Sequence, residues 1–281
     1  MIMHNRIITK ERLEQYGHYL VTEEKSPASK EKYLRDMKAF FIFTDGRPVT
    51  KELVMEYKAM CLQRGYAVRS INSMLASINS FLLFAGWEDC KVKSIRLQRQ
   101  AYCPEEQEIS KAEYMRLLQA SRQNEQLFLI LQTICATGIR VSELQQFTVE
   151  QVKQGQIIVS CKNKTRRIFV PKKLKKILLT FAARRKIDHG AIFLDKNGNP
   201  LDRSSIWRRM KRLCGAANVQ DSKVFPHNLR KLFARTFYEL DKDIAKLADI
   251  LGHSSINTTR IYIMTSGAEH RRQIERMRLL I

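Results

Sequence analysis

Four residues suited to phosphate chemistry lie close together in the sequence between positions 226 and 263. His227 and Arg230 are three positions apart, which places both side chains on one side of a helix. His253 follows a Leu-Gly pair, and Tyr262 comes nine positions later. Two imidazoles, a guanidinium and a phenol that face one pocket would suit a phosphate.

Three helices are predicted to position these side chains. Pro226 is typical of a first helical turn, and apolar residues recur after it at a spacing of three and four. A second helix spans 243–251 and ends at Gly252, which can take the left-handed conformation, so the next residue falls on a tight corner. A third helix, 257–263, follows two serines that suit an N-cap.

An arginine earlier in the chain extends the set. Arg140 follows a Thr-Gly pair at a predicted helix start, where backbone amides and the helix dipole favour an anion. Glu143 lies one turn further on and would hold the guanidinium in place. In isolation, Arg140 would more often be an ordinary surface charge.

A basic hairpin is predicted between residues 157 and 170. Residues 157–161 and 168–170 have the composition of two strands, and 192–194 are expected to add a third. The tip carries Lys162, Lys164, Arg166 and Arg167. Such a tip is suited to enter a DNA groove beside a phosphate, although an isolated basic turn is usually only solvated.

Together these motifs resemble the tyrosine recombinase, or phage integrase, family, and in particular its two-domain, Xer-like members. The family pattern combines His-x-x-Arg, Leu-Gly-His and a tyrosine nine positions on with an earlier motif that Ala136-Thr-Gly-Ile-Arg140-Val-Ser-Glu143-Leu matches. The hairpin departs from the pattern, because the usual glycine after the lysine is missing and one residue is added before the second strand. The resemblance is strong from Ser110 onward and weak in the first hundred residues.

The resemblance implies how the phosphate would be bound and attacked. Arg140 and Arg230 would grip the non-bridging oxygens, with Glu143 in support, and His253 would donate a hydrogen bond to the phosphoryl group. Tyr262 would attack to give a 3′-phosphotyrosine and a free 5′-hydroxyl.

The resemblance also implies the proton transfers. His227 would act as the base for the tyrosine, and Lys162 would protonate the leaving 5′ oxygen, with Lys164 as the alternative lysine. No cofactor and no metal are expected.

The charge of the chain points to a polyanionic partner. The 281 residues include 50 Lys and Arg against 28 Asp and Glu, a formal net charge of +22. Such a chain binds nucleic acid through counterion release. No apolar run approaches the roughly 18–20 residues that span a membrane, and the N-terminus lacks a signal-peptide core. The six cysteines include no C-x-x-C pair, so they suggest neither a zinc site nor a disulfide framework. We expect a protein of the bacterial cytoplasm that associates with the nucleoid when it acts on DNA.

The predicted fold is mainly α with a small β-sheet, in two domains. Residues 1–100 are expected to form an all-helical DNA-binding domain, which by resemblance is SAM-like. Residues 101–109 are expected to form a linker, and 110–281 an α+β catalytic domain that opens with a Ser-x-x-Glu capping box. The two domains would close around DNA as a C-shaped clamp. The resemblance implies that a tail, about 265–281, docks on a neighbouring protomer.

Two further segments are candidates for DNA contacts. The polar face of the helix 68–85 includes small or basic side chains that could approach phosphates: Arg69, Ser70, Asn72 and Ser73. A second basic helix carries Arg203, Arg208 and Arg209. For both helices a solvated surface is an equally good interpretation.

The leading function hypothesis is a site-specific recombinase that works as a homotetramer on two double-stranded DNA core sites through a Holliday junction, without ATP. An accessory DNA-bending or directionality protein is left open. A type IB topoisomerase would use a similar pocket as a monomer, and relaxation of DNA that lacks a recognition site would favour it. A DNA-binding regulator without catalysis is the third hypothesis, and the complete set of six candidate catalytic residues argues against it.

Overall fold

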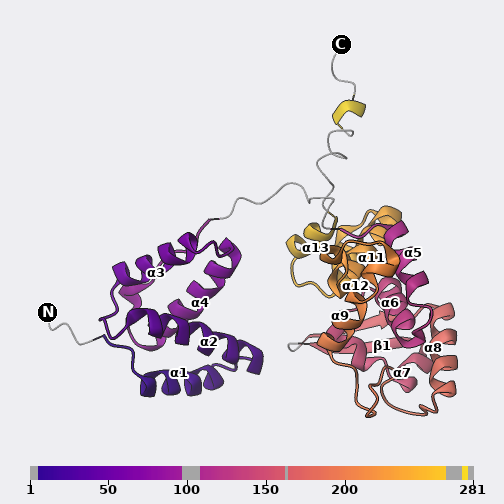
Figure 1. Cartoon of the computed structure of the whole chain (residues 1–281), viewed down its shortest axis with the longest axis horizontal. Helices are drawn as coiled ribbons and strands as arrows, with labels where there is room; N and C mark the ends of the chain where they lie inside the picture. Colours follow the sequence, from indigo (N-terminus) through magenta and orange to yellow (C-terminus); the bar gives the residue numbers. More distant parts are fainter. Residues whose placement is uncertain (1–5, 97–107, 162–163, 264–273, 278–281) are drawn as a thin grey trace. The chain divides into compact units, whose positions relative to one another are not determined.

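The computed structural model describes residues 6–96, 108–161, 164–263 and 274–277, with the side chains of 161 and 164 excepted (Figure 1). The chain divides into two compact units, residues 1–99 and 100–281. Most described residues are helical, and the only sheet among them is a hairpin of two strands. The predicted fold class, mainly α with a small β-sheet, is confirmed.

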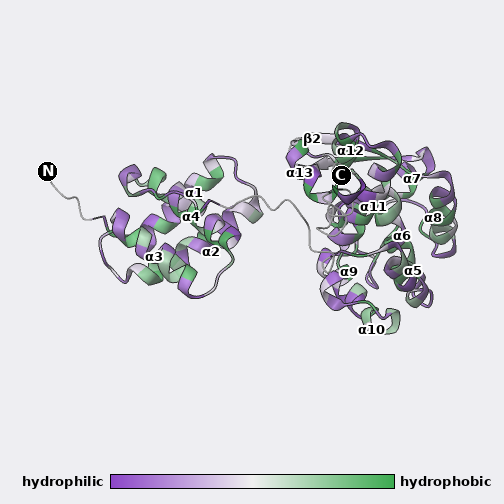
Figure 2. Ribbon diagram, turned by 90° about the horizontal axis from the view of Figure 1, so that it is seen from above, coloured by the Kyte–Doolittle hydropathy of each residue, from purple (hydrophilic) through white to green (hydrophobic). Residues whose placement is uncertain are grey.

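The first unit is a small helical domain. Its helices are α1 (Lys10–Thr22), α2 (Pro27–Thr44), α3 (Lys51–Gln63) and α4 (Val68–Phe84), followed by the short 3-10 helix η1 (Glu88–Cys90). Side-chain oxygens of Thr9, Ser26 and Thr50 accept backbone N–H bonds at the starts of the first three helices. Apolar and polar residues alternate along these helices, and the apolar ones form a single core (Figure 2).

Part of the polar face of α4 is used inside the first unit. The Asn72 side chain donates to the carbonyl of Ile95 (2.9 Å) and accepts from its N–H (2.8 Å). Asn79 makes the same pair of bonds with Val92. These amides therefore hold the segment that follows η1 along the helix, whereas Arg69, Ser70 and Ser73 are exposed.

The second unit packs its helices around one large core. Its elements are α5 (Lys111–Ala120), α6 (Glu125–Thr137), η3 (Val141–Gln146), α7 (Val149–Gln154), β1 (Gln156–Cys161), β2 (Lys164–Phe169), α8 (Lys172–Arg184), α9 (Arg203–Lys211), α10 (Cys214–Ala217), η4 (Asp221–Lys223), α11 (Pro226–Asp241), α12 (Ile244–Leu251) and α13 (Ile256–Ile263). Ser110 and Glu113 form the predicted capping box at the start of α5. The apolar helix α6 is central and packs against α11.

The sheet is smaller than the sequence suggests. Strands β1 and β2 pair antiparallel, with Ile157 opposite Ile168 and Val159 opposite Arg166. The predicted third strand at 192–194 is wrong, because this segment makes only isolated bridges, from Ala191 to Thr148 and from Leu194 to Pro200. Ile192 and Phe193 are fully buried, so their apolar character reflects core packing and not strand pairing.

Helices α11, α12 and α13 lie together in both views of the second unit (Figures 1 and 2). Gly252 ends α12 with φ 64°, as predicted. A small apolar cluster of Ala234, Leu247, Leu251 and Tyr262 joins the three helices. This packing brings residues far apart in the sequence to one place.

Candidate functional site

Arg140 is fixed by its own turn and by the corner after α12. It caps η3, and its backbone N–H and Nη1 donate to the two carboxylate oxygens of Glu143, at 2.9 and 3.0 Å. Its Nη2 donates to the carbonyl of Gly252 at 3.2 Å. The side chain is 36% exposed. The guanidinium is therefore held in one orientation while part of it remains open to a ligand.

Glu143 is shared by two arginines. It is buried, and besides Arg140 it binds Nη2 of Arg166 on β2. Nη1 of Arg166 donates to the carbonyl of Ile250 near the end of α12 (2.7 Å). Arg166 was predicted to contact DNA at the hairpin tip, but its guanidinium lies against Glu143 and α12, and its side chain is only 12% exposed.

Arg230 is the most deeply buried charge of the site. Its side chain, on the first turns of α11, donates to the carbonyl of Gly138 and to that of Leu251 (2.6 Å). Burial, with the neighbouring Arg140 second, lowers the pKa of Arg230 to about 10, so the group stays protonated at neutral pH. Within the part of the chain that the structure describes, its Nε has no hydrogen-bond partner.

His253 bridges Arg230 and the last helix. Its Nε2 lies 3.2 Å from Nη2 of Arg230, and its Nδ1 lies 2.9 Å from Oγ1 of Thr259 on α13. Burial, followed by the charges of Arg230 and Arg140, lowers the pKa of His253 to about 4. The imidazole is therefore neutral at physiological pH.

Tyr262 lies between the two histidines. Its ring centroid is 5.0 Å from that of His253 and 5.1 Å from that of His227, and it is 6% exposed. His227 is open to solvent on one side. Burial of the rest of its ring, followed by Lys231 and Arg230, lowers its pKa to about 4. Of the six predicted catalytic residues, five are thus brought together in one cluster.

The sixth, Lys162, lies outside the described residues. Lys164, the alternative, is paired through its backbone with Cys161 in the β1–β2 ladder, and its side chain lies outside the described part of the chain. The choice between the two lysines stays a prediction.

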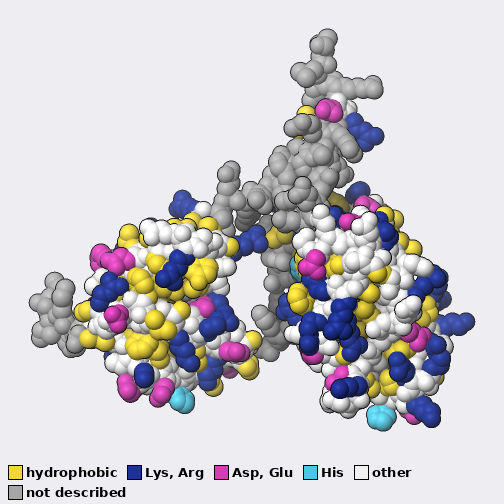
Figure 3. All heavy atoms as spheres, in the orientation of Figure 1, with side chains coloured by type: hydrophobic (Ala, Val, Ile, Leu, Met, Phe, Trp, Pro, Cys, Tyr) yellow, Lys and Arg dark blue, Asp and Glu magenta, His cyan; other side chains and the backbone are white. Residues whose placement is uncertain are grey.

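The other predicted DNA contacts differ in their surroundings. Arg203 and Arg208 on α9 are exposed, and Lys and Arg side chains gather over α9 in Figure 3. Arg203 is near enough to help lower the pKa of His227. Arg209 instead donates to Oε1 of Gln126 (3.0 Å), so its guanidinium has a partner within the domain.

Sequence reasoning did not identify Thr259 or the inward role of Arg166. Thr259 is fully buried and lies one turn before Tyr262, and this spacing was the available signal. For Arg166 the alternation along β2 was the signal, because it places Arg166 on the same face as the buried Ile168.

Comparison with known proteins identifies the family in which this arrangement of residues occurs. Residues 107–269 match the Phage integrase family, and residues 13–89 match the N-terminal SAM-like domain of phage integrases. The chain belongs to the phage integrase family. Membership of this family makes it a tyrosine-type site-specific DNA recombinase, and the resemblance inferred from the motifs is confirmed.

Relatives in the family cover nearly the whole chain. The tyrosine recombinase XerA of Pyrococcus furiosus is 26% identical, over 99% of this chain and 98% of its own length. The tyrosine recombinase XerD of Halalkalibacterium halodurans is 27% identical, over 89% of this chain and 91% of its own length.

Solved structures of the family have the same fold. A lambda integrase fragment in a dimer bound to a core site aligns with a TM-score of 0.74 at 17% identity, over 92% of this chain and 96% of that one. The XerH recombinase bound to its difH substrate aligns with a TM-score of 0.71 at 16% identity, over 95% of this chain and 84% of that one.

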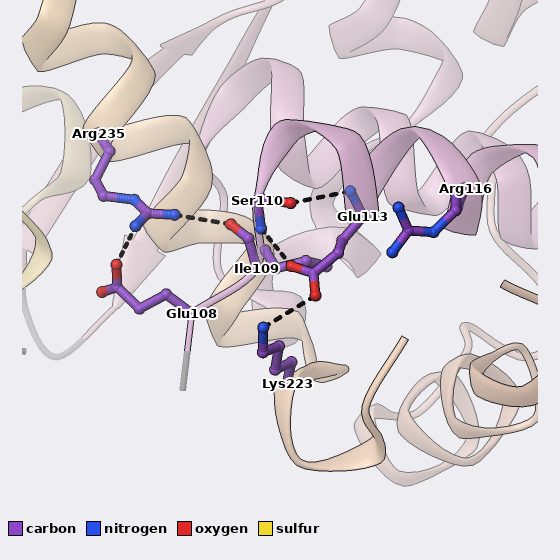
Figure 4. A pocket seen from close by; sticks show the side chains of 7 residues that line it. All are labelled: Glu108, Ile109, Ser110, Glu113, Arg116, Lys223 and Arg235. Atoms are coloured by element: carbon purple, nitrogen blue, oxygen red, sulfur yellow. Dashed lines mark hydrogen bonds and ion pairs between the residues drawn. The ribbon is translucent and has the colours of Figure 1, made fainter. Parts of the chain in front are cut away.

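A hollow in the integrase domain, apart from this cluster, is lined mainly by charged residues in ion pairs (Figure 4). Glu108 binds Arg235 on α11, and Lys223 donates to Glu113 at 3.0 Å. These contacts fasten the start of the domain to η4 and to α11, the helix of His227 and Arg230. Among the described residues we find no group of three metal-binding side chains and no helix long and apolar enough to cross a membrane.

Proposed function

We propose that this recombinase cleaves and rejoins DNA strands through a covalent bond between Tyr262 and a 3′ phosphate. The observation that supports this most strongly is the position of the Tyr262 ring between His227 and His253, next to Arg230. The Tyr262 oxygen forms a bond to phosphorus while the bond to the 5′ oxygen breaks. The phosphotyrosine keeps the bond energy, so a second 5′-hydroxyl reverses the step without ATP.

Arg140 and Arg230 stabilise the charge on the phosphoryl oxygens. Both guanidiniums are oriented by carbonyl or carboxylate partners, so they need little reorganisation when a phosphate binds. The buried Nε of Arg230, which has no partner among the described residues, is a donor that a phosphate oxygen would satisfy.

His227 and Lys162 carry the protons. A phenol with an ordinary pKa near 10 is protonated at neutral pH, so the attack needs a base. The neutral ring of His227 accepts this proton, and Lys162, or Lys164 in its place, gives a proton to the departing 5′ oxygen. His253 donates a hydrogen bond to the phosphoryl group.

We propose a duplex with a short core site as substrate and a homotetramer on two such sites as the active assembly. A lambda integrase tetramer bound to a Holliday junction shares the fold, with a TM-score of 0.72. In the first domain Arg69, Ser70 and Ser73 are the exposed candidates for phosphate contacts, and in the second Arg203 and Arg208. Asn72, Arg166 and Arg209 have partners within the chain.

The test uses supercoiled plasmids that carry two copies of the DNA flanking the gene, or none. Recombination predicts deletion or inversion products only from the plasmid with two copies. Equal relaxation of both plasmids, with no rearranged product, would instead support the topoisomerase alternative.

A further inference from the structure

Thr259 connects the helix of the nucleophile to a pocket histidine. It lies on α13 three residues before Tyr262, and its side chain is fully buried. Its hydroxyl oxygen is 2.9 Å from Nδ1 of His253. A buried hydroxyl that hydrogen-bonds a ring nitrogen of a site histidine can fix the orientation of that ring.

The contact with Arg230 determines which ring nitrogen of His253 carries the proton. A guanidinium has donors only, so Nε2, which faces Nη2 of Arg230 at 3.2 Å, must accept. The ring is neutral, because burial and the nearby arginines lower its pKa to about 4. Its one proton is therefore on Nδ1, which donates to Thr259 Oγ1.

We propose that Thr259 is a positioning residue that holds the ring of His253 in place through Nδ1 and ties this histidine to the helix that carries Tyr262. A hydroxyl can accept a hydrogen bond or donate one. When a phosphate takes the donors of Arg230, the proton moves from Nδ1 to Nε2, and the ring stays neutral. The Thr259 hydroxyl then reverses and donates to Nδ1, so His253 keeps its orientation and Nε2 can donate to the phosphoryl oxygen.

A consequence is that His253 is oriented only while α13 is docked. Any event that moves Tyr262 out of the pocket also removes Thr259 from His253, because both lie one turn apart on a single short helix. This consequence depends on the proposed function, whereas the tautomer assignment does not.

The test compares Thr259→Val, which keeps the volume but lacks the hydroxyl, with Thr259→Ser, which keeps the hydroxyl. The first measurement is the nitrogen-15 NMR spectrum of the histidine side chains in the full chain without DNA. The wild-type protein and the serine variant are expected to show a hydrogen-bonded Nδ1–H on His253. The valine variant is expected to keep the same tautomer but to show a shifted Nδ1 signal, because Nδ1–H has lost its acceptor. An unchanged His253 spectrum in the valine variant would overturn the proposal.

The second measurement is the single-turnover rate of adduct formation on saturating DNA. We expect Thr259→Val to lower this rate by about 10- to 100-fold with unchanged DNA affinity, and Thr259→Ser to restore it. Thermal unfolding of each variant checks that the valine protein is folded. Equal rates for all three proteins would contradict the role in catalysis. If the wild type forms no adduct on any DNA, the proposed function fails, and the NMR comparison still decides the role of Thr259.

Discussion

At the scale of single residues, the two arginines of the site are already oriented by protein partners before a phosphate arrives. Arg140 binds a carboxylate on one side and a backbone carbonyl on the other, which requires the flat fork of a guanidinium. A lysine in its place has one point charge and cannot make both contacts while it binds a phosphate.

We therefore expect Arg140→Lys to lower the rate of DNA cleavage by about 100-fold or more with little change in DNA binding. Single-turnover cleavage and a gel-shift titration measure the two effects. The control is Arg212→Lys, since Arg212 is exposed beyond the end of α9. Near-normal cleavage by Arg140→Lys would remove the bidentate role.

The histidines give the reaction a specific pH dependence. Both His227 and His253 have a pKa near 4, so both rings are neutral from pH 8 down to about pH 5. The base must be neutral to accept a proton, so the rate of adduct formation should be insensitive to histidine ionisation in this range and fall as the pH approaches 4. Circular dichroism at each pH monitors folding. A loss of rate centred near pH 6.5 would contradict this account, because it would indicate an ordinary histidine.

The sequence predicted which residues come together wherever a motif fixed their spacing. It was less informative about which hydrogen-bond partner each side chain has. Arg140, His227, Arg230, His253 and Tyr262 were selected by motif and spacing, and the structure places these five side chains together, while their catalytic roles stay predictions. Arg166 was assigned to DNA because it is basic and near a turn, but its direction depends on the strand register, which a sequence with an altered hairpin does not specify.

At the scale of elements, the corner between α12 and α13 positions the pocket. Gly252 has φ 64°, and a Cβ on it would lie 2.3 Å from Cδ of Arg166. The corner therefore needs glycine both for its backbone and for the close passage of Arg166. The carbonyls of Ile250, Leu251 and Gly252 each bind a different arginine of the site.

Gly252→Ala should destabilise the protein and slow cleavage, because it strains the backbone by roughly 1–2 kcal/mol and displaces Arg166 from Glu143. Gly155→Ala is the matched control, since Gly155 also ends a helix with φ 77° but has no atoms within 4 Å of the added Cβ. Thermal unfolding and single-turnover cleavage separate the two effects. If both variants cleave equally fast, the Arg166 contact has no role in the site.

Helix positions followed well from sequence, because caps and periodicity are local. The start at Pro226, the capping box before Lys111 and the end at Gly252 agree with the structure. The predicted third strand was wrong, because Ile192 and Phe193 form an apolar run that fits a strand or a buried loop equally well.

At the scale of the whole molecule, the net charge of +22 and the two domains suit a duplex partner. The clamp, the linker and the tail remain predictions, because the linker and most of the tail lie outside the described residues. The spacing of apolar residues along the sequence predicts local helices and does not specify contacts between protomers.

Deletion of residues 266–281 tests the tail. If the tail docks on a neighbouring protomer, the truncated protein should bind a single core site with nearly normal affinity and lose cooperative binding to paired sites. A gel-shift titration on single and paired sites measures both. Equal losses on the two DNAs would argue that the tail serves folding or DNA binding and not assembly.

The central claim is that Tyr262 becomes covalently attached to DNA, and the most direct measurement is the adduct itself. Wild-type protein and Tyr262→Phe are incubated with nicked core-site DNA labelled on either side of the cleavage point, separated on a denaturing gel, and the adduct is mapped by peptide mass spectrometry. We predict an adduct on the 3′ phosphate at Tyr262 in the wild type and none in Tyr262→Phe, which should still bind DNA. An adduct that persists in the phenylalanine variant, or that maps to another residue, would contradict the account.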